Sequence, residues 1–167
     1  ELKFIIPKVK KAFIKNFWLE KEGYLADVVK NGENKTDVRP NQIFAVSLPF
    51  SPLSKKQAKK VLDVVEYELL TPVGLRTLSK KAFLYKGFYE GDQKARDQAY
   101  HNGTVWPWLL GHFTDGLIKV YKKGEILKKI SLTIEYLEIH LKKEGGLGYI
   151  SEIFDGEPPY KARGCIA

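Results

Sequence analysis

The chain has 167 residues and a net charge of +8, so it is long enough for one ordinary domain and carries a clear excess of positive charge. Nearly all of this charge is lysine, in pairs such as Lys55-Lys56 and Lys128-Lys129 that are typical of solvated helix faces. Base reading and bidentate phosphate contacts favour arginine, and the chain has only four arginines, so we expect no nucleic-acid partner.

A single cysteine, Cys165, allows no internal disulfide and indicates a reducing, cytoplasmic location. No apolar run reaches the roughly 18 residues of a membrane span, so we expect no membrane partner. The sequence has neither a metal-ligand spacing of histidine, cysteine and carboxylate residues nor a glycine-rich phosphate loop. We therefore expect no metal and no cofactor.

The first half of the chain predicts three helices separated by loops. Apolar residues recur every three to four positions from Leu2 to Phe17 and predict a helix with one buried face. Pro40 suits the first turn of a short helix that Pro49 ends. Ser54 to Gln57 form a capping box, and the helix behind it has one apolar face. That face consists of Ala58, Val61, Leu62, Val65 and Leu69.

The second half alternates long loops with helices. Residues 74–99 have no sustained period and are predicted to form a loop. The next helix is predicted to have Thr104 as its N-cap and Pro107 in its first turn, and the helix after it ends at Gly145-Gly146. A polar loop follows over residues 148–160, and residues 162–167 are expected to begin a further helix.

This layout predicts an all-α fold of helical hairpins whose loops build a pocket at one end. Strand signals are slight, and no repeat of 20–50 residues indicates a solenoid. Because the apolar faces are wide and the last helix is cut short, residues 1–167 are interpreted as a piece of a larger all-helical domain rather than a closed unit. Apolar faces left uncovered in this way are expected to favour self-association.

The densest polar and aromatic stretch of the chain runs from Gly91 to Trp108. A loop with a purely structural role needs glycine and proline, but it does not need phenol, imidazole and indole groups in close succession. Indole faces stack on the C–H surfaces of sugars, while amide, imidazole and carboxylate groups bond hydroxyls. The stretch therefore favours a polyhydroxylated ligand.

Three segments together resemble a known enzyme family in order and spacing, namely residues 39–42 (Arg-Pro-Asn-Gln), 100–108 (Tyr-His-Asn-Gly-Thr-Val-Trp-Pro-Trp) and 151–156 (Ser-Glu-Ile-Phe-Asp-Gly). From about Phe17 to its last residue the chain resembles the C-terminal catalytic domain of prokaryotic and archaeal-type glycogen debranching enzymes. These are the amylo-alpha-1,6-glucosidases of glycoside hydrolase family 133. The resemblance implies an (α/α)6 barrel with the active site in the loops at one end, and it implies that residues 1–167 are the C-terminal portion of this single catalytic domain, truncated at both ends. It also implies hydrolysis, with inversion, of alpha-1,6-linked glucose at branch points of glycogen or another branched alpha-glucan.

An inverting glycosidase needs a carboxylic acid that protonates the leaving oxygen and a carboxylate that activates water. The resemblance assigns the base to Glu152, for which the structural alternative is a loop glutamate that caps the next helix. The acid of the family is an aspartate in a Thr-Trp-Met-Asp type motif, which does not occur in this sequence. We therefore expect the acid to lie outside the chain and the isolated chain to be inactive. Asp97 and Asp92 are the fallback candidates for the acid.

Seven residues are predicted to bind the substrate glucose: Arg39, Asn41, Asp97, Tyr100, His101, Trp106 and Trp108. For several of them a structural role remains open. Arg39 is an equal candidate for an ion pair with Asp37 or with a loop carboxylate, and Asp97 for an ion pair with Arg96. Either tryptophan can be the stacking platform while the other belongs to the core. Three further expectations are that Asn102-Gly103 forms a tight turn, that Tyr160 and Arg163 orient Glu152, and that His112 and His140 are non-catalytic.

Two other functions remain open at this point. One is another sugar-active hydrolase on the same barrel, of the glucoamylase or trehalase kind. The second is a non-catalytic basic helical module that binds a polyanion.

Overall fold

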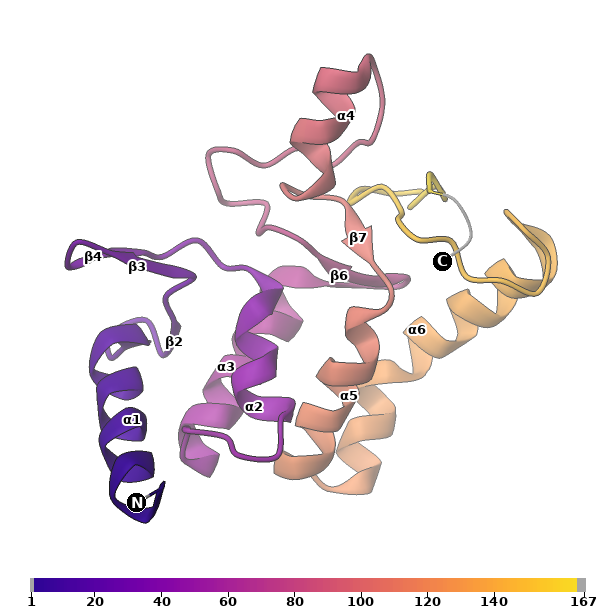
Figure 1. Cartoon of the computed structure of the whole chain (residues 1–167). Coiled ribbons are helices and arrows are strands. Elements are labelled where there is room, and N and C mark those ends of the chain that lie inside the picture. The colour runs from indigo at the N-terminus through magenta and orange to yellow at the C-terminus, as the bar shows by residue number, and fades with distance from the viewer. Residues whose placement is uncertain (1, 165–167) are drawn as a thin grey trace.

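The computed structural model describes residues 2–164, and they fold into a mostly helical unit with three very small sheets (Figure 1). The helices are α1 Leu2–Phe17, the 3-10 helix η1 Pro40–Ile43, α2 Phe44–Ser47, α3 Lys55–Leu69, α4 Gln93–Tyr100, α5 Leu109–Val120 and α6 Lys123–Lys143. The antiparallel sheets pair β1 Trp18–Leu19 with β2 Tyr24–Leu25, β3 Val28–Lys30 with β4 Glu33–Lys35, and join β5 Leu70–Thr71, β6 Gly74–Arg76 and β7 Val105–Trp106.

The core lies between α3, α2, η1 and α5. The predicted apolar face of α3 is confirmed, because its five residues are all buried. The predicted capping box is also confirmed, with the Ser54 hydroxyl accepting from Gln57 N–H and the Gln57 side chain accepting from Ser54 N–H. From α5, Phe113 and Leu117 fill the facing side, and Gly116 lets the two helices approach closely because a Cβ there would meet Leu62 at 2.9 Å. The capping box and the apolar face, both visible in the sequence, thus determine where α3 begins and which side of it packs against α5.

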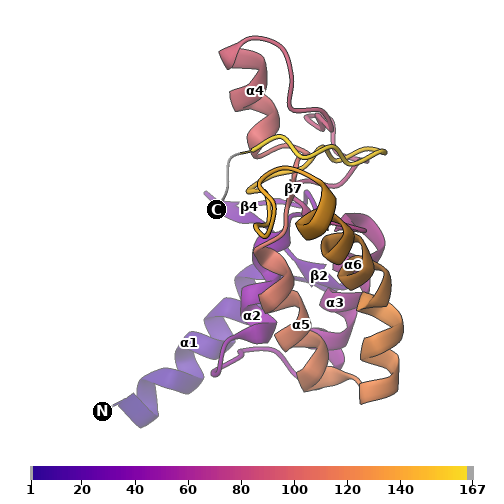
Figure 2. The same cartoon turned by 90° about the vertical axis from the view of Figure 1, so that its right-hand side faces the viewer.

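Helix α1 exists as predicted, but the prediction that it has one buried face is wrong for most of its length. Phe4 is 79% exposed and Val9 is 60% exposed. Only the last turns contribute to the core, through the stacked rings of Phe13 and Phe17, whose centroids are 5.0 Å apart. Both views show α1 projecting away from the other helices (Figures 1 and 2). The amphipathic pattern thus produced a helix, while the described residues provide no neighbour for its first half.

The small sheet β5–β6–β7 lies where α3 ends and α5 begins, and its strands were not predicted from the sequence. Residues 74–99 were predicted to form a loop, yet β6 and α4 lie within them. The N-cap predicted at Thr104 is also wrong, because α5 begins at Leu109 after β7. Thr104 is buried and its hydroxyl donates to the Tyr100 carbonyl at 2.8 Å, so it completes the end of α4 rather than the start of α5. The consequence is that residues 100–108 cross the sheet instead of leading directly into a helix.

Helix α6 packs against α5, contacts Thr71 through Thr133 and the segment 151–156 through His140, and is exposed on its opposite face. Leu132 and Ile134 are each 54% exposed, and the open face also includes Leu127, Tyr136 and Ile139. The helix ends before Gly145-Gly146 as predicted, and Gly124 lies inside its first turn rather than between two helices. In the expected final helix, Ala162 to Gly164 are not helical, and the remaining positions lie outside the described residues.

The long helices lie on one side of the molecule, and the connecting segments gather at the other (Figures 1 and 2). This is the predicted arrangement of helices with loops at one end. The closed barrel implied by the resemblance remains a prediction, because residues 2–164 form a mostly helical unit with small sheets in which no barrel is seen. Within residues 2–164, no helix has both the length and the apolar character that crossing a membrane requires.

Candidate active site

Three segments that are far apart in the sequence meet above α3 and α5. The segment 100–108 is central because β7 within it pairs with β6. The backbone of Phe154 exchanges two hydrogen bonds with Val105, at 2.9 and 3.0 Å, which attaches the segment 151–156 to β7. On the other side, the guanidinium of Arg39 in the segment 39–42 donates to the His101 carbonyl at 2.5 Å. These are the three segments that carry the resemblance, and the fold brings them together.

Glu152 lies beside Tyr100, fifty-two positions earlier in the chain. The Tyr100 hydroxyl donates to Glu152 Oε1 at 2.5 Å. The hydrogen bond to Glu152, together with burial, raises the pKa of Tyr100 to about 12, so the phenol keeps its proton and remains a donor. Glu152 itself is exposed, which leaves its carboxylate accessible to water. There is no helix between Glu152 and Gly164, so Glu152 does not cap a following helix within the described residues.

The aromatic side chains of segment 100–108 form one connected cluster. The Tyr100 ring centroid lies 4.9 Å from that of His101 and 5.0 Å from that of Trp106. Trp106 and Trp108 are 6.4 Å apart and tilted by 36°. Trp108 also stacks on Phe44 of α2 at 6.0 Å. The cluster therefore extends from the Glu152 carboxylate to the surface of α2.

The two tryptophans have different surroundings. Trp108 is 55% exposed, whereas Trp106 is half-buried against the core. The indole N–H of Trp106 is buried and has no acceptor among the described residues. A buried donor without a partner is unusual in a native protein, which sets this indole apart from the exposed one of Trp108. The exposed indole of Trp108 is the one that can offer a face to a sugar.

A cleft of about 80 Å³ opens next to this cluster. Its lining includes five of the seven predicted substrate-binding residues, namely Arg39, Asn41, His101, Trp106 and Trp108. Pockets that enclose a small ligand measure roughly 300–1,000 Å³, so the cleft is too small to enclose one. The cleft can therefore contact one side of a bound sugar but cannot surround it.

Arg39 forms an ion pair and hydrogen bonds within the protein, in agreement with the alternative in which it pairs with a loop carboxylate. Its Nε lies 3.4 Å from the Asp27 carboxylate, and its other nitrogens donate to the carbonyls of Thr77 and His101 and to the side chain of Asn102. The loop carboxylate of that alternative is therefore Asp27, which also accepts from Asn41 Nδ2 at 3.1 Å. Arg39 ties together the segments that frame the cleft, and its contact with a sugar hydroxyl stays a prediction.

Asp97 and Asp92 lie on α4, away from the lining of the cleft. Asp97 is exposed, and Arg96 donates to the Gly91 carbonyl at 2.5 Å, so the Arg96–Asp97 ion pair is absent from the described contacts. Asp92 is the N-cap of α4 and accepts from Ala95 N–H at 2.8 Å. The structure thus gives Asp92 a structural role, while the predicted roles of Asp97 remain predictions.

Asn102-Gly103 forms a turn, as predicted, and Gly103 is required there. Gly103 has φ +152°, and a Cβ at this position would lie 2.3 Å from the Lys86 carbonyl oxygen. Gly156 approaches the Gly103 carbonyl even more closely, since a Cβ there would meet that oxygen at 2.1 Å. The two glycines let the segments 100–108 and 151–156 lie against each other.

The anchors of the Glu152 segment were not found from the sequence. Asp155 is 2% exposed and accepts from Tyr89 N–H and from Arg163 Nε, each at 2.8 Å. The buried Arg76 donates to the Gly156 carbonyl at 2.8 Å. Arg163 was expected to orient Glu152, and it pairs with Asp155 instead. The signal that could have identified these residues is the arginine of β6 itself, because a buried guanidinium needs acceptors.

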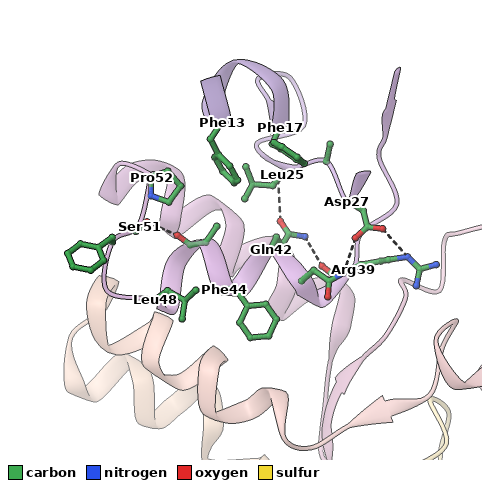
Figure 3. A pocket seen from close by; sticks show the side chains of 14 residues that line it. Phe13, Phe17, Leu25, Asp27, Arg39, Gln42, Phe44, Leu48, Ser51 and Pro52 are labelled. Atoms are coloured by element: carbon green, nitrogen blue, oxygen red, sulfur yellow. Dashed lines mark hydrogen bonds and ion pairs between the residues drawn. The ribbon is translucent and has the colours of Figure 1, made fainter. Parts of the chain in front are cut away.

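A larger groove of about 350 Å³ runs between α1 and α2 (Figure 3). Its lining is mostly apolar and includes Phe13, Phe17, Phe44 and Phe50. Its polar side chains are already paired, Asp27 with Arg39 and Gln42 with the backbone of Leu25 and Arg39 (Figure 3). A sugar would find few free hydrogen-bonding groups there, whereas the smaller cleft adds the imidazole of His101 and the two indoles to its lining.

Comparison with known proteins gives two findings. The sequence profile of a family described as amylo-alpha-1,6-glucosidase matches residues 1–167, the whole chain. The glycogen debranching enzyme of Saccharomyces cerevisiae is 30% identical over 105 residues, which cover 57% of this chain and 7% of that protein. The chain therefore spans a small part of the length of this curated relative.

Proposed function

The chain belongs to the amylo-alpha-1,6-glucosidase family, and from this premise we propose that it carries part of the active site of a glycogen-debranching glucosidase. The proposed substrate is an alpha-1,6-linked glucose at a branch point of glycogen or a similar alpha-glucan. The observation that carries the proposal is the exposed Glu152 carboxylate, held by the Tyr100 hydroxyl at 2.5 Å at the edge of an aromatic cluster.

In the proposed reaction Glu152 is the general base. Its carboxylate takes a proton from a water molecule, and the water oxygen attacks the anomeric carbon on the face opposite the leaving oxygen. Because attack comes from the opposite face, an alpha-linked substrate releases beta-glucose. The water-accessible position of Glu152 supports this role, since a base in an inverting enzyme needs room for the attacking water.

The sugar is proposed to lie against the wall formed by His101, Trp106 and Trp108. Trp108 presents the exposed indole face, and the imidazole of His101 can bond a hydroxyl. We propose that Tyr100 belongs to the base rather than to the sugar, because its hydroxyl is engaged with Glu152.

The general acid is proposed to come from residues outside these 167. The two fallback aspartates support this view, since Asp92 caps α4 and no hydrogen bond or ion pair within residues 2–164 joins the exposed Asp97 to Glu152 or Tyr100. A glucosidase with a base and no acid is inactive toward a poor leaving group such as a sugar hydroxyl. The 167-residue chain alone is thus expected to release no glucose, and robust release by that chain would contradict the assignment.

The reaction class can be tested on the intact enzyme that contains this chain. Proton NMR during the first minutes of hydrolysis reports which anomer of glucose forms first. A panel of alpha-1,6-branched dextrins, linear alpha-1,4-glucans and trehalose separates debranching from the glucoamylase and trehalase alternatives. The proposal expects beta-glucose from the branched dextrins, whereas alpha-glucose or preferential cleavage of another substrate would overturn it.

A further inference from the structure

His140 is buried in the last turn of α6 and contacts the segment that carries Glu152. Its side chain is 2% exposed. The backbone N–H of Ser151 donates to His140 Nε2 at 3.2 Å. The imidazole also packs edge-on against the Phe154 ring, at 4.8 Å between centroids. His140 therefore contacts the residue before Glu152 and a residue just after it.

The hydrogen bonds determine the tautomer of the ring. Because Nε2 accepts a hydrogen bond from the Ser151 N–H, Nε2 must be unprotonated, and the ring proton must lie on Nδ1. Nδ1 faces the Glu144 carboxylate at 3.3 Å, which is the acceptor that such a proton needs. Among the described residues, Glu144 is the charged group in contact with His140, and the loop side presents Ser151, Gly145 and Phe154.

The segment between α6 and Glu152 has few other attachments to the scaffold. Residues 147–150 are exposed, and the backbone hydrogen bonds here, from Gly148 to Leu141 and from Tyr149 to Gly146, close local turns. Ser151 is buried, and its N–H is the first polar group after these turns to bond a residue of the α6 interior. Beyond Glu152, Phe154 is attached to β7. The backbone after Glu152 is thus held at Ile153 by Arg163 and at Phe154 by β7, and His140 provides the attachment before Glu152, at Ser151.

We propose that His140 is a positioning residue for the general base, acting through the Ser151 backbone rather than by touching the substrate. This inference rests on the proposed function of Glu152. Displacing a reacting group by about 1 Å can cost on the order of 100-fold in rate, so the loss of the attachment at Ser151 is expected to affect turnover. The sugar wall of Trp106 and Trp108 lies on a different segment and is not held by His140.

Two substitutions in the intact enzyme separate this role from simple packing. His140→Gln places an amide oxygen near the position of Nε2 and can still accept from Ser151. His140→Phe keeps an aromatic ring against Phe154 but has no acceptor, so the buried Ser151 N–H loses its partner. We expect His140→Gln to retain kcat within about threefold. We expect His140→Phe to lower kcat by about 10- to 100-fold while KM for branched dextrin changes by less than about threefold.

Equal kcat in the two variants, or a rise in KM as large as the fall in kcat, would overturn the proposal. If His140→Phe does not fold, the wild-type protein provides a second measurement. NMR of the enzyme labelled with nitrogen-15 histidine, assigned with His140→Gln, distinguishes the tautomers. The proposal requires an unprotonated Nε2 on neutral His140, and a protonated Nε2 would refute it.

Glu152→Gln, measured alongside, separates a failure of the base assignment for Glu152 from a failure of the positioning role of His140. Normal turnover in Glu152→Gln would remove the base assignment and with it the reason for positioning. Loss of turnover in Glu152→Gln together with equal kcat in the two His140 variants would remove only the role of His140.

Discussion

The bond between Tyr100 and Glu152 can be tested by removing one hydroxyl. Tyr100→Phe keeps the ring, and with it the contacts of 4.9 Å to His101 and 5.0 Å to Trp106, while deleting the donor that lies 2.5 Å from Glu152 Oε1. A hydrogen bond to a charged group contributes about 1.5–3 kcal/mol. Because Glu152 is exposed, we take about 1 kcal/mol after screening by water, which corresponds to roughly a fivefold fall in kcat.

The assay is initial-rate glucose release from a branched dextrin by the intact enzyme, with kcat and KM determined separately. Tyr89→Phe is the matched control, because its ring lies 6.1 Å from that of Tyr100 and its hydroxyl has no hydrogen bond among the described residues. A fall in kcat at constant KM supports the bond to the base. An unchanged kcat with raised KM would refute it and restore Tyr100 to the sugar contact that the sequence predicts.

Three further predictions concern binding, stability and titration. Trp108→Ala is expected to raise KM about tenfold, for roughly 1.4 kcal/mol of lost stacking, with little change in unfolding temperature because Trp108 is 55% exposed; a destabilised protein with unchanged KM would contradict this. Arg39→Lys is expected to lower the free energy of unfolding in urea by about 2 kcal/mol, since one ammonium cannot replace a guanidinium that bonds the backbone and pairs with Asp27, and full stability would count against the tether. Glu152→Gln should lower the pKa of Tyr100 from about 12 toward its ordinary 10, so that in ultraviolet titration one phenol ionises at lower pH than in the wild type, and an unchanged titration would exclude the Tyr100–Glu152 bond.

The elements that the sequence predicted well are those determined by local interactions. The capping box at Ser54 and the apolar face of α3 involve residues within one or two turns of each other, so they can be recognised without knowledge of the tertiary structure. Strands β6 and β7 have only three and two residues, too few to show an alternation, and they exist because Leu75 and Arg76 find Trp106 and Val105 as partners. Thr104 has the residue type of an N-cap but bonds backward to Tyr100, a choice that only the tertiary structure determines.

For the site too, the sequence indicated which residue types matter but not which residues they contact. The sequence indicated that the segments around Arg39, Tyr100 and Glu152 belong together, and the fold places them side by side. It could not indicate that Tyr100 faces Glu152, nor that Asp27 is the carboxylate beside Arg39, because both depend on pairing between distant segments. The exposed first half of α1 has a comparable cause, since its periodicity reports an apolar face but not whether a neighbour covers it.

The central claim, that Glu152 is the general base, is tested most directly by the turnover of Glu152→Gln in the intact enzyme. General base catalysis contributes about 100- to 10,000-fold, so the variant should lose at least two orders of magnitude in kcat while still binding glycogen. Glu90→Gln is a matched control, because Glu90 is 64% exposed and within residues 2–164 makes only a 3.6 Å ion pair with Arg163, and it should keep near-normal turnover. Wild-type kcat in Glu152→Gln would show that Glu152 is not the general base.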